Sequence, residues 1–275
     1  MLNGSMFARA PQIVPTKVVT AAASRIQSVD AVRGLIIMIM ALDHTRDFFH
    51  SAAMVFPPED MTRTWTALFL TRWITHFCAP GFALLAGVSA WLWKERSGRS
   101  TSELSRFLLI RGLWLVFLEI IVMRFAMFFG LFSGPLILLV LWSLGCSMIV
   151  LAALVYLPVR LLAVVSVIVI ATHDLFDRVQ ANSLGAAAWI WNILHQPGAF
   201  MVPGGIVVVV AYPLVPWFAV MACGYCMGRL FDRRFSGRAR WLACTGTAFT
   251  LAFVALRALN VYGDPRPWSA ALHPV

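Results

Sequence analysis

Long apolar runs are the feature that most constrains how this chain folds. Residues 136–157, 205–220 and 241–256 are almost free of charge, and each approaches the ~20 residues that an α-helix needs to cross a bilayer. Hydrophobic residues make up 60% of the 275 residues and charged residues 12%, against roughly 45–50% and 25% in soluble domains. The sequence therefore excludes an ordinary soluble domain and indicates a membrane protein.

The apolar runs predict an all-α fold, a polytopic transmembrane helix bundle with about seven spanning helices. The expected helices cover residues 29–49, 70–93, 107–125, 136–156, 159–172, 212–230 and 241–259. The segment 174–211 mixes polar residues with tryptophans and Pro197–Gly198, which predicts an outer loop with an interfacial helix. Within it, the run Ile206–Val210 is compatible with a re-entrant turn.

The domain boundaries follow from these helices. Residues 1–24 lack the compact apolar core of a signal peptide, so we expect a flexible cytoplasmic tail. Residues 25–262 form the expected transmembrane domain, and residues 263–275 form an outer C-terminal tail.

The distribution of basic residues predicts the orientation. With the amino terminus inside, Lys and Arg favour the inner segments over the outer ones by about two to one. We therefore expect a cytoplasmic N-terminus. The same bias accounts for the formal net charge of +10, and no zinc-finger or Gly-rich RNA-binding pattern accompanies it, so we expect no nucleic-acid partner.

The five cysteines lie in apolar stretches, and their odd number leaves no complete disulfide framework. Cys223 and Cys226 form a C-x-x-C inside an expected spanning helix without a second ligand pair nearby. We interpret this motif as helix packing and expect no metal.

Ionisable residues gather at the expected outer ends of the helices. All six histidines fall there: His44, His50, His76, His173, His195 and His273. Several aspartates and arginines accompany them: Asp43, Asp47, Asp174, Asp177, Asp264, Arg46, Arg72 and Arg257. An ionisable group at membrane depth costs about 2.5–3.5 kcal/mol on insertion scales. The pattern therefore predicts a polar cavity that opens on the outer face.

The outer end of the first helix carries the first candidate catalytic group. Asp43 precedes His44, and Asp47 follows it three residues later. A carboxylate beside an imidazole fixes its tautomer and makes it a better proton acceptor, as acyl transfer requires. We predict His44 as a general base oriented by Asp43 or Asp47, without a metal. The alternative is an ion-paired helix end that anchors at the lipid headgroups.

The second and last helices carry further candidates. Arg72, His76 and Pro80 share one helix face, which predicts His76 as a second catalytic residue and Arg72 as a substrate ligand, with a packing adjustment at the proline as the alternative. Arg257, Asn260 and Asp264 form a stripe whose donors and acceptors suit a sugar, and they would equally cap the helix end. Small-residue pairs such as Ala83 with Gly87 and Gly224 with Gly228 predict close helix contacts.

Several motifs, taken together and in order, resemble a known family. They are Arg25 to Asp30-x-x-Arg33-Gly34, Leu42-Asp43-His44-x-Arg46-Asp47-Phe48, Thr71-Arg72-Trp73-x-Thr75-His76-Phe77-x-Ala79-Pro80, Tyr212-Pro213-Leu214-x-Pro216-Trp217 and Leu256-Arg257-x-x-Asn260-x-Tyr262-Gly263-Asp264-Pro265. The chain resembles, from about Arg25 to Trp268, bacterial members of the heparan-alpha-glucosaminide N-acetyltransferase catalytic-domain family.

The resemblance implies a polytopic inner-membrane enzyme that takes an acetyl group from acetyl-CoA on the cytoplasmic side and delivers it to an amino sugar or similar acceptor outside. Arg33 is then expected to hold a CoA phosphate, with Arg96, Arg233 and Arg234 as further inner cations. Arg46 is expected to contact the acceptor with the other outer arginines. The expected partners are the lipid bilayer, a sugar or lipid-linked glycan and, in a homodimer, a second copy of the chain.

Two departures from the family pattern bear on function. The lysosomal member has its catalytic histidine between the first two helices, where a rough alignment places Thr66 in this chain. His44, His50 or His76 must then replace it. Relatives continue through further helices after Gly263-Asp264-Pro265, so a chain ending at Val275 is expected to be a truncated member.

Three other functions stay open from the sequence. A separate acyltransferase family, whose acyl groups can be longer, has a similar first helix, but the motifs after the second helix argue against it. A transporter or flippase for a polar solute would use the same cavity without chemistry, and we see no inverted repeat. A non-catalytic truncated member is the third alternative.

Overall fold

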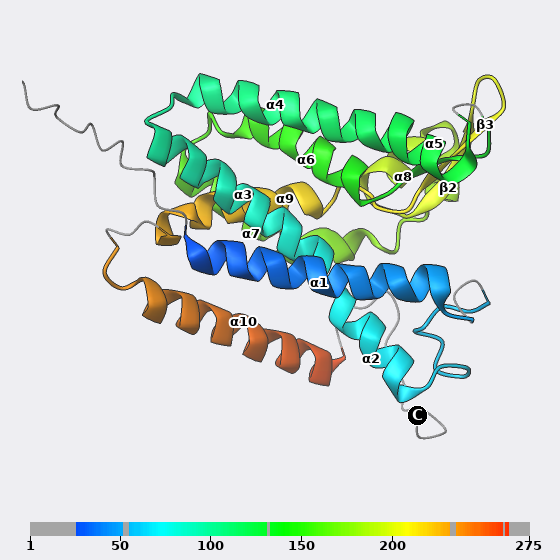
Figure 1. The fold of residues 1–275 in the computed structure, drawn as a ribbon, viewed down its shortest axis with the longest axis horizontal. Helices are drawn as coiled ribbons and strands as arrows, with labels where there is room; N and C mark the ends of the chain where they lie inside the picture. Colours follow the sequence, from blue (N-terminus) through cyan, green and yellow to red (C-terminus); the bar gives the residue numbers. More distant parts are fainter. Residues whose placement is uncertain (1–25, 52–54, 131–132, 232–234, 261, 264–275) are drawn as a thin grey trace, which may run out of the picture.

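The computed structural model describes residues 26–51, 55–130, 133–231, 235–260 and 262–263. The long helices lie roughly along the longest axis of the molecule, so the connecting segments gather at its two ends (Figure 1). One end holds the start of α1 (Gln27–Phe49) and the end of α3 (Cys78–Ser97). We call this the amino-terminal end, and the opposite end, where α1 finishes, the histidine-rich end.

The second expected helix is broken in two. α2 (Thr66–Thr75) ends just before His76, and α3 begins at Cys78. Pro80 explains the break, because a proline ring clashes with the carbonyl four residues earlier, here that of His76. Pro80 is also the third residue of α3, where its missing N–H costs no intrahelical hydrogen bond.

α4 (Thr101–Phe117) begins six residues before the expected start because of a capping box. The Ser100 hydroxyl accepts from the Glu103 N–H at 3.2 Å, and the Glu103 carboxylate accepts from the Ser100 N–H at 2.9 Å. This reciprocal pair satisfies two N–H groups that a helix start leaves free. The helix continues through a π-helical turn, η1 (Leu118–Met123), into α5 (Arg124–Phe128).

The remaining long helices follow the expected apolar runs. They are α6 (Val140–Leu154), α7 (Val159–Thr172), α9 (Trp217–Met227) and α10 (Arg238–Leu259). Shorter pieces connect them: η2 (His173–Phe176), η3 (Ala181–Ala187), α8 (Ala188–Leu194) and η4 (Gly228–Phe231).

A small sheet at the histidine-rich end corrects the expectation of an all-α fold. Its strands are β1 (Leu136–Leu138), β2 (Gly198–Val202) and β3 (Ile206–Val210) in the order β1-β3-β2. β1 runs parallel to β3 and β2 antiparallel to it, with Leu136 opposite Val208 and Ala199 opposite Val209. The run Ile206–Val210 is therefore a strand and not a re-entrant turn, because pairing on both sides satisfies its backbone.

The core forms where small residues let helices approach. At the crossing of α3 and α9, a Cβ on Gly87 would collide with the backbone of Met221, and one on Gly224 with the backbone of Leu84. Between α4 and α6, a Cβ on Gly112 would lie 2.6 Å from the Gly145 carbonyl oxygen. The small-residue motifs in α3 and α9 are thus confirmed as close helix contacts.

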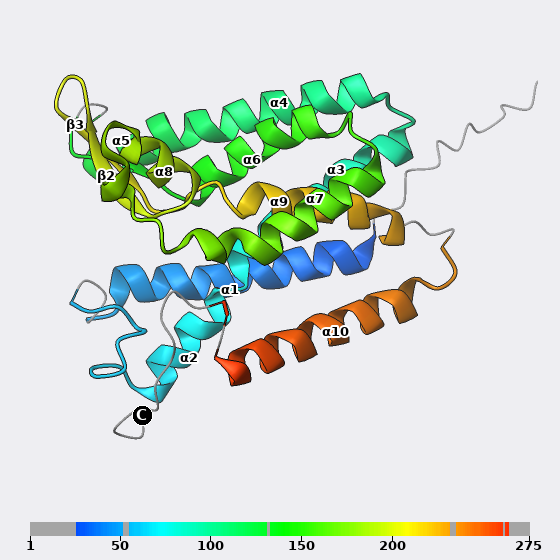
Figure 2. The same cartoon turned by 180° about the vertical axis from the view of Figure 1, so that it is seen from behind.

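The structure is mostly helical, and within the described residues three helical segments are long and apolar enough to cross a membrane: Thr66–Ser97, Val159–Phe176 and Arg238–Leu259. Two shorter apolar segments, Val140–Leu154 and Trp217–Phe231, accompany them. α10 stands apart from the bundle in both views (Figures 1 and 2). None of its residues is buried, and it packs mainly against η4.

Candidate functional site

A network of charged side chains joins the ends of α1 and α2. Arg46 is its centre, with its Nη2 atom 2.6 Å from Asp43 Oδ1 and 2.8 Å from Asp47 Oδ1. The Thr75 hydroxyl on α2 donates to Asp43 at 2.7 Å. The Thr75 contact crosses between the two helices, so it helps to fix how α2 packs against α1.

The network continues through Arg72 into the loop between the helices. Arg72 Nη1 lies 3.5 Å from Asp43 Oδ2, and its Nε donates to Glu59 Oε1 at 2.7 Å. Partial burial by itself raises the pKa of Glu59, but the hydrogen bond and charge of Arg72, with a smaller effect of His76, lower that pKa overall. Glu59 is therefore held as a carboxylate.

His76 is the histidine that the network reaches. Its Nδ1 lies 2.7 Å from the Arg72 carbonyl oxygen, which can only accept, so Nδ1 carries the proton. Nε2 then presents its lone pair, 3.9 Å from Glu59 Oε1. An imidazole in this tautomer is able to take up a proton, and Glu59 would stabilise the resulting cation.

A pocket of about 380 Å³ opens between α1 and α2 beside this network. Its lining consists of Leu42, Thr45, Arg46, Phe49, His50, Trp65, Ala67, Leu68 and Thr71. Arg46 is 9% exposed, and its Nη1 atom has no hydrogen-bond partner among the described residues. The ring of His50 lies 5.3 Å from that of Trp65, centroid to centroid. The pocket thus combines a buried cation that has a spare donor with an imidazole and two hydroxyl groups.

The structure does not bring His44 to either carboxylate. Asp43 and Asp47 both bind Arg46, because a guanidinium makes a stronger, charge-assisted bond to a carboxylate than a neutral imidazole does. At 100° per residue, His44 also points about 160° away from Arg46, whereas Leu42, Arg46 and Phe49 share the pocket face. His44 is exposed, and its ring lies 6.3 Å from that of Phe48.

The segment after β3 carries Tyr212 to the network. The Ala211 and Tyr212 N–H groups both donate to the Leu138 carbonyl of β1, at 3.1 and 3.3 Å. The Tyr212 phenol interacts electrostatically with Arg72 and Asp43. The sheet therefore positions Tyr212, the first residue of one of the family-like motifs, beside the network.

A second polar cluster adjoins this segment. The Leu214 and Val215 N–H groups donate to the carbonyls of Ile193 and Leu194 at 2.9 Å each. The next residue, His195, has its Nε2 2.8 Å from Asp177 Oδ1, and its side chain is 7% exposed. The Tyr212 segment thus links the charge network to a His–Asp pair whose imidazole is buried.

The other predicted site residues lie elsewhere. Asn260 adopts a left-handed conformation with φ +54° and ends α10, as the capping alternative had it. Arg257 is exposed on α10, and neither residue is among those that line the α1–α2 pocket. Arg33, towards the amino-terminal end of α1, binds Asp30 at 3.1 Å and the Ser89 hydroxyl at 2.6 Å. Asp264, Arg233 and Arg234 lie outside the described residues.

Sequence reasoning missed three contributors to the site. Glu59 lies in a loop with no periodicity, Thr75 reads as an ordinary helix residue, and the pairing of His195 with Asp177 joins residues from different elements. Only the clustering of ionisable residues at one end signalled them. Where the structure describes the chain, no three His, Cys, Asp or Glu side chains gather in a way that would hold a metal ion.

Comparison with known proteins supports the resemblance seen in the motifs. A family described as "Heparan-alpha-glucosaminide N-acetyltransferase, catalytic" matches residues 25–263, most of the chain. No curated protein and no solved structure matched the chain. The matched region contains the α1–α2 network, the pocket and the Tyr212 segment. The chain therefore belongs to the heparan-alpha-glucosaminide N-acetyltransferase catalytic family.

Proposed function

We propose that this protein is an integral-membrane acetyltransferase that moves an acetyl group from acetyl-CoA to an amino or hydroxyl group of a sugar outside the cytoplasm. Family membership indicates an acetyltransferase, and the three long apolar helices fit a membrane location. The gathering of histidines and carboxylates at one end supports transfer on that side. The proposed location is the inner membrane, with the basic amino-terminal end in the cytoplasm.

The unpartnered Nη1 atom of Arg46 is the observation that carries the proposal. A buried donor without a partner is costly, by about 1–3 kcal/mol or more for a charged group. Asp43 and Asp47 hold the Nε and Nη2 atoms of the guanidinium, and Arg46 is among the residues that line the pocket. A carbonyl oxygen of the acyl group would satisfy this atom and gain most as negative charge develops on it.

The proposal moves the general base from His44 to His50. His50 lines the same pocket as Arg46, whereas His44 points away from it. In the transfer, the acceptor nitrogen or oxygen forms a bond to the acyl carbon, and its proton passes to the imidazole. The bond from the acyl carbon to sulfur breaks, and the CoA thiolate leaves and takes up a proton. His76 is the second candidate base because of its tautomer.

The amino-terminal end is the proposed donor side. Arg33 would bind a CoA phosphate there, and its present ties to Asp30 and Ser89 fix the guanidinium near the α1–α3 contact. Other basic residues occupy the same end, among them Lys94, Arg99 and Arg238. This end therefore suits an anionic donor.

The test measures acetyl-CoA binding and acetyl-CoA hydrolysis by detergent-purified protein. We expect His50→Ala to lower the rate by about 10²–10⁴-fold, as loss of a general base does. Arg46→Lys keeps the charge but loses the planar guanidinium that can bond two carboxylates and a ligand at once. We expect it to lower the rate by about 10²–10³-fold. His44→Ala is the matched control and should stay within about twofold of wild type, since an exposed side chain away from the pocket contributes little.

Two results would contradict the proposal. Loss of activity in His44→Ala with His50→Ala unaffected would overturn the assignment of the base. No acetyl-CoA binding at millimolar concentration would overturn the function itself and favour a transporter.

A further inference from the structure

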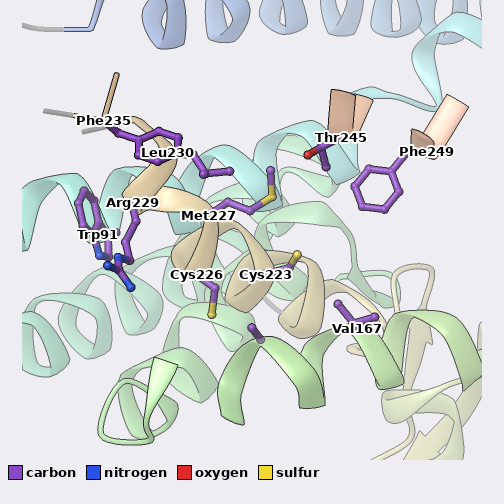
Figure 3. A pocket seen from close by; sticks show the side chains of 11 residues that line it. Trp91, Val167, Cys223, Cys226, Met227, Arg229, Leu230, Phe235, Thr245 and Phe249 are labelled. Atoms are coloured by element: carbon purple, nitrogen blue, oxygen red, sulfur yellow. The ribbon is translucent and has the colours of Figure 1, made fainter. Parts of the chain in front are cut away.

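A second cavity shares none of its described lining residues with the α1–α2 pocket. It has a volume of about 650 Å³, within the range of small-molecule sites. Its walls come from α3, α7, α9, η4 and α10, with Phe235 completing them (Figure 3): Trp91, Ala163, Val167, Cys223, Cys226, Met227, Arg229, Leu230, Phe235, Thr245 and Phe249. No residue of α1 or α2 lines this cavity, so it is separate from the charge network.

The charge of the cavity lies at one of its ends. Arg229 and Trp91 lie at one end and Val167 and Phe249 at the other (Figure 3). Among the described residues that line it, Arg229 is the charged one, and no carboxylate in the described part of the chain pairs with it. A ligand that fits must therefore combine an anionic group with a long apolar chain.

The chemistry of the walls separates two anionic ligands. The pantetheine arm of CoA carries amide groups that need hydrogen-bond partners when buried. Besides Arg229, the described lining side chains offer the Trp91 indole N–H, the Thr245 hydroxyl and two thiols. The Thr245 hydroxyl already donates to the Trp241 carbonyl at 2.8 Å, and the Cys226 thiol to the Val159 carbonyl at 3.6 Å. A hydrocarbon chain needs no such partners, so the walls favour a lipid.

The position of α10 also favours a lipid. This helix has no buried residue, yet it carries an apolar segment long enough to span a membrane. Thr245 and Phe249 are its contributions to the cavity, facing Val167 of α7 and Cys223 of α9. The space between α10 and the bundle is therefore one that a membrane would fill with an acyl chain.

We propose that this cavity binds an anionic phospholipid of the surrounding bilayer, with its phosphate on Arg229 and one acyl chain lying between α9 and α10. The lipid links α10 to the rest of the bundle. Arg229 lies near the amino-terminal end of the molecule, where η4 follows α9. This position fits the proposed orientation of the lipid, because headgroups lie at the membrane surface and acyl chains point to the centre of the bilayer.

The test titrates phosphatidylglycerol or phosphatidylcholine into detergent-purified full-length protein and counts retained lipids by native mass spectrometry. We expect wild type to bind phosphatidylglycerol about fivefold more tightly than phosphatidylcholine, the effect of about 1 kcal/mol from one arginine near the headgroup. Arg229→Gln should abolish that preference and leave the phosphatidylcholine affinity unchanged. Arg160→Gln, an exposed arginine at the same end outside the cavity, should behave as wild type.

Variants that fill the cavity give an independent test of the lipid site. Ala163→Phe fills it from α7 and Thr245→Trp from α10, and both should lower retention of either lipid at least about tenfold. Thr245→Trp guards against misfolding of the first variant, because α10 is barely packed. Ala255→Phe makes the same substitution as Ala163→Phe, but on the exposed face of α10 outside the cavity, and this variant should retain lipid normally.

Three results would overturn the proposal. If Arg160→Gln loses the preference for phosphatidylglycerol as fully as Arg229→Gln does, the lipid binds to surface charge and not to the cavity. Unchanged lipid retention in both filled variants would show that the lipid lies elsewhere. Loss of acetyl-CoA binding in the filled variants, with phosphatidylglycerol retained, would assign the cavity to the donor. Lipid counts do not depend on catalysis, so failure here is distinguishable from failure of the acetyltransferase proposal.

Discussion

At the scale of the residue, Arg46 organises the histidine-rich end of α1. Arg46 follows two residues after His44, the histidine that the sequence predicted as the base. It binds Asp43 and Asp47, the two carboxylates that were expected to orient that histidine. The outcome follows from bond strength, since an arginine fork binds a carboxylate more tightly than a neutral imidazole does. The consequence is a buried guanidinium whose Nη1 atom has no hydrogen-bond partner among the described residues.

Glu59 gives the network a predictable response to pH. Its pKa in the folded protein lies below the ordinary value of 4.5, so its contribution to stability is present above that value and is lost as the pH falls through the folded pKa. We expect Glu59→Gln to lower the apparent Tm at pH 7 by about 2–4 °C, because a half-exposed pair contributes about 1 kcal/mol or less.

The measurement follows thermal unfolding of both proteins as the pH falls from 7 to below 4.5. The difference in apparent Tm should shrink in the acid range. Glu95→Gln, an exposed glutamate near the end of α3, serves as the control and should show no such difference. A gap between wild type and Glu59→Gln that stays constant down to the lowest pH would show that the carboxylate charge is not what stabilises the loop.

At the scale of the element, the crossing of α3 and α9 depends on glycine. Gly87 and Gly224 bring the two backbones into contact, and the buried Met221 lies at that contact. Close approach of this kind gives van der Waals packing that larger side chains would prevent, which matters in a membrane where the hydrophobic effect does not drive helices together. The crossing holds together the bundle that the two sites flank.

Substituting one glycine at this crossing tests its importance. Gly87→Ala should destabilise by about 1–3 kcal/mol, because the new methyl group meets backbone atoms that cannot rotate away. Gly34→Ala on α1 is the matched control, since nothing lies within 4 Å of its Cβ position. It should be neutral or stabilising, as alanine favours a helix by roughly 1 kcal/mol over glycine. Equal apparent Tm values for the two variants would disprove the role assigned to the crossing.

At the scale of the whole molecule, the charges divide between two ends. Histidines and carboxylates gather where α1 finishes, and basic residues gather where it begins. Helices that run lengthwise keep these ends apart (Figure 1). A donor that enters on one side and an acceptor on the other would meet within such a bundle.

The orientation is testable by labelling in intact cells. In a variant without native cysteines, Val55→Cys should react with a membrane-impermeant maleimide, since this exposed residue follows α1 at the histidine-rich end. Ser97→Cys, at the opposite end of α3, should react only after the cells are lysed. The reverse pattern would place the amino-terminal end outside, contrary to the positive-inside distribution.

The sequence by itself determined the membrane class, the family and most helix ranges, because apolar runs, proline and glycine act locally along the chain. It also indicated the polar end, since the histidines fall at the expected outer ends of the helices. It did not reveal the sheet, because the strand runs 136–138 and 206–210 are as apolar as the neighbouring helices and become strands only by pairing with each other.

The tertiary structure alone decided which side chains meet. Glu59 reaches Arg72 across a loop, and His195 reaches Asp177 between two elements. The rotation of α1 decided that Arg46 and not His44 faces the pocket. These outcomes depend on competition among charged groups and on how helices rotate against one another, which spacing along one helix does not record.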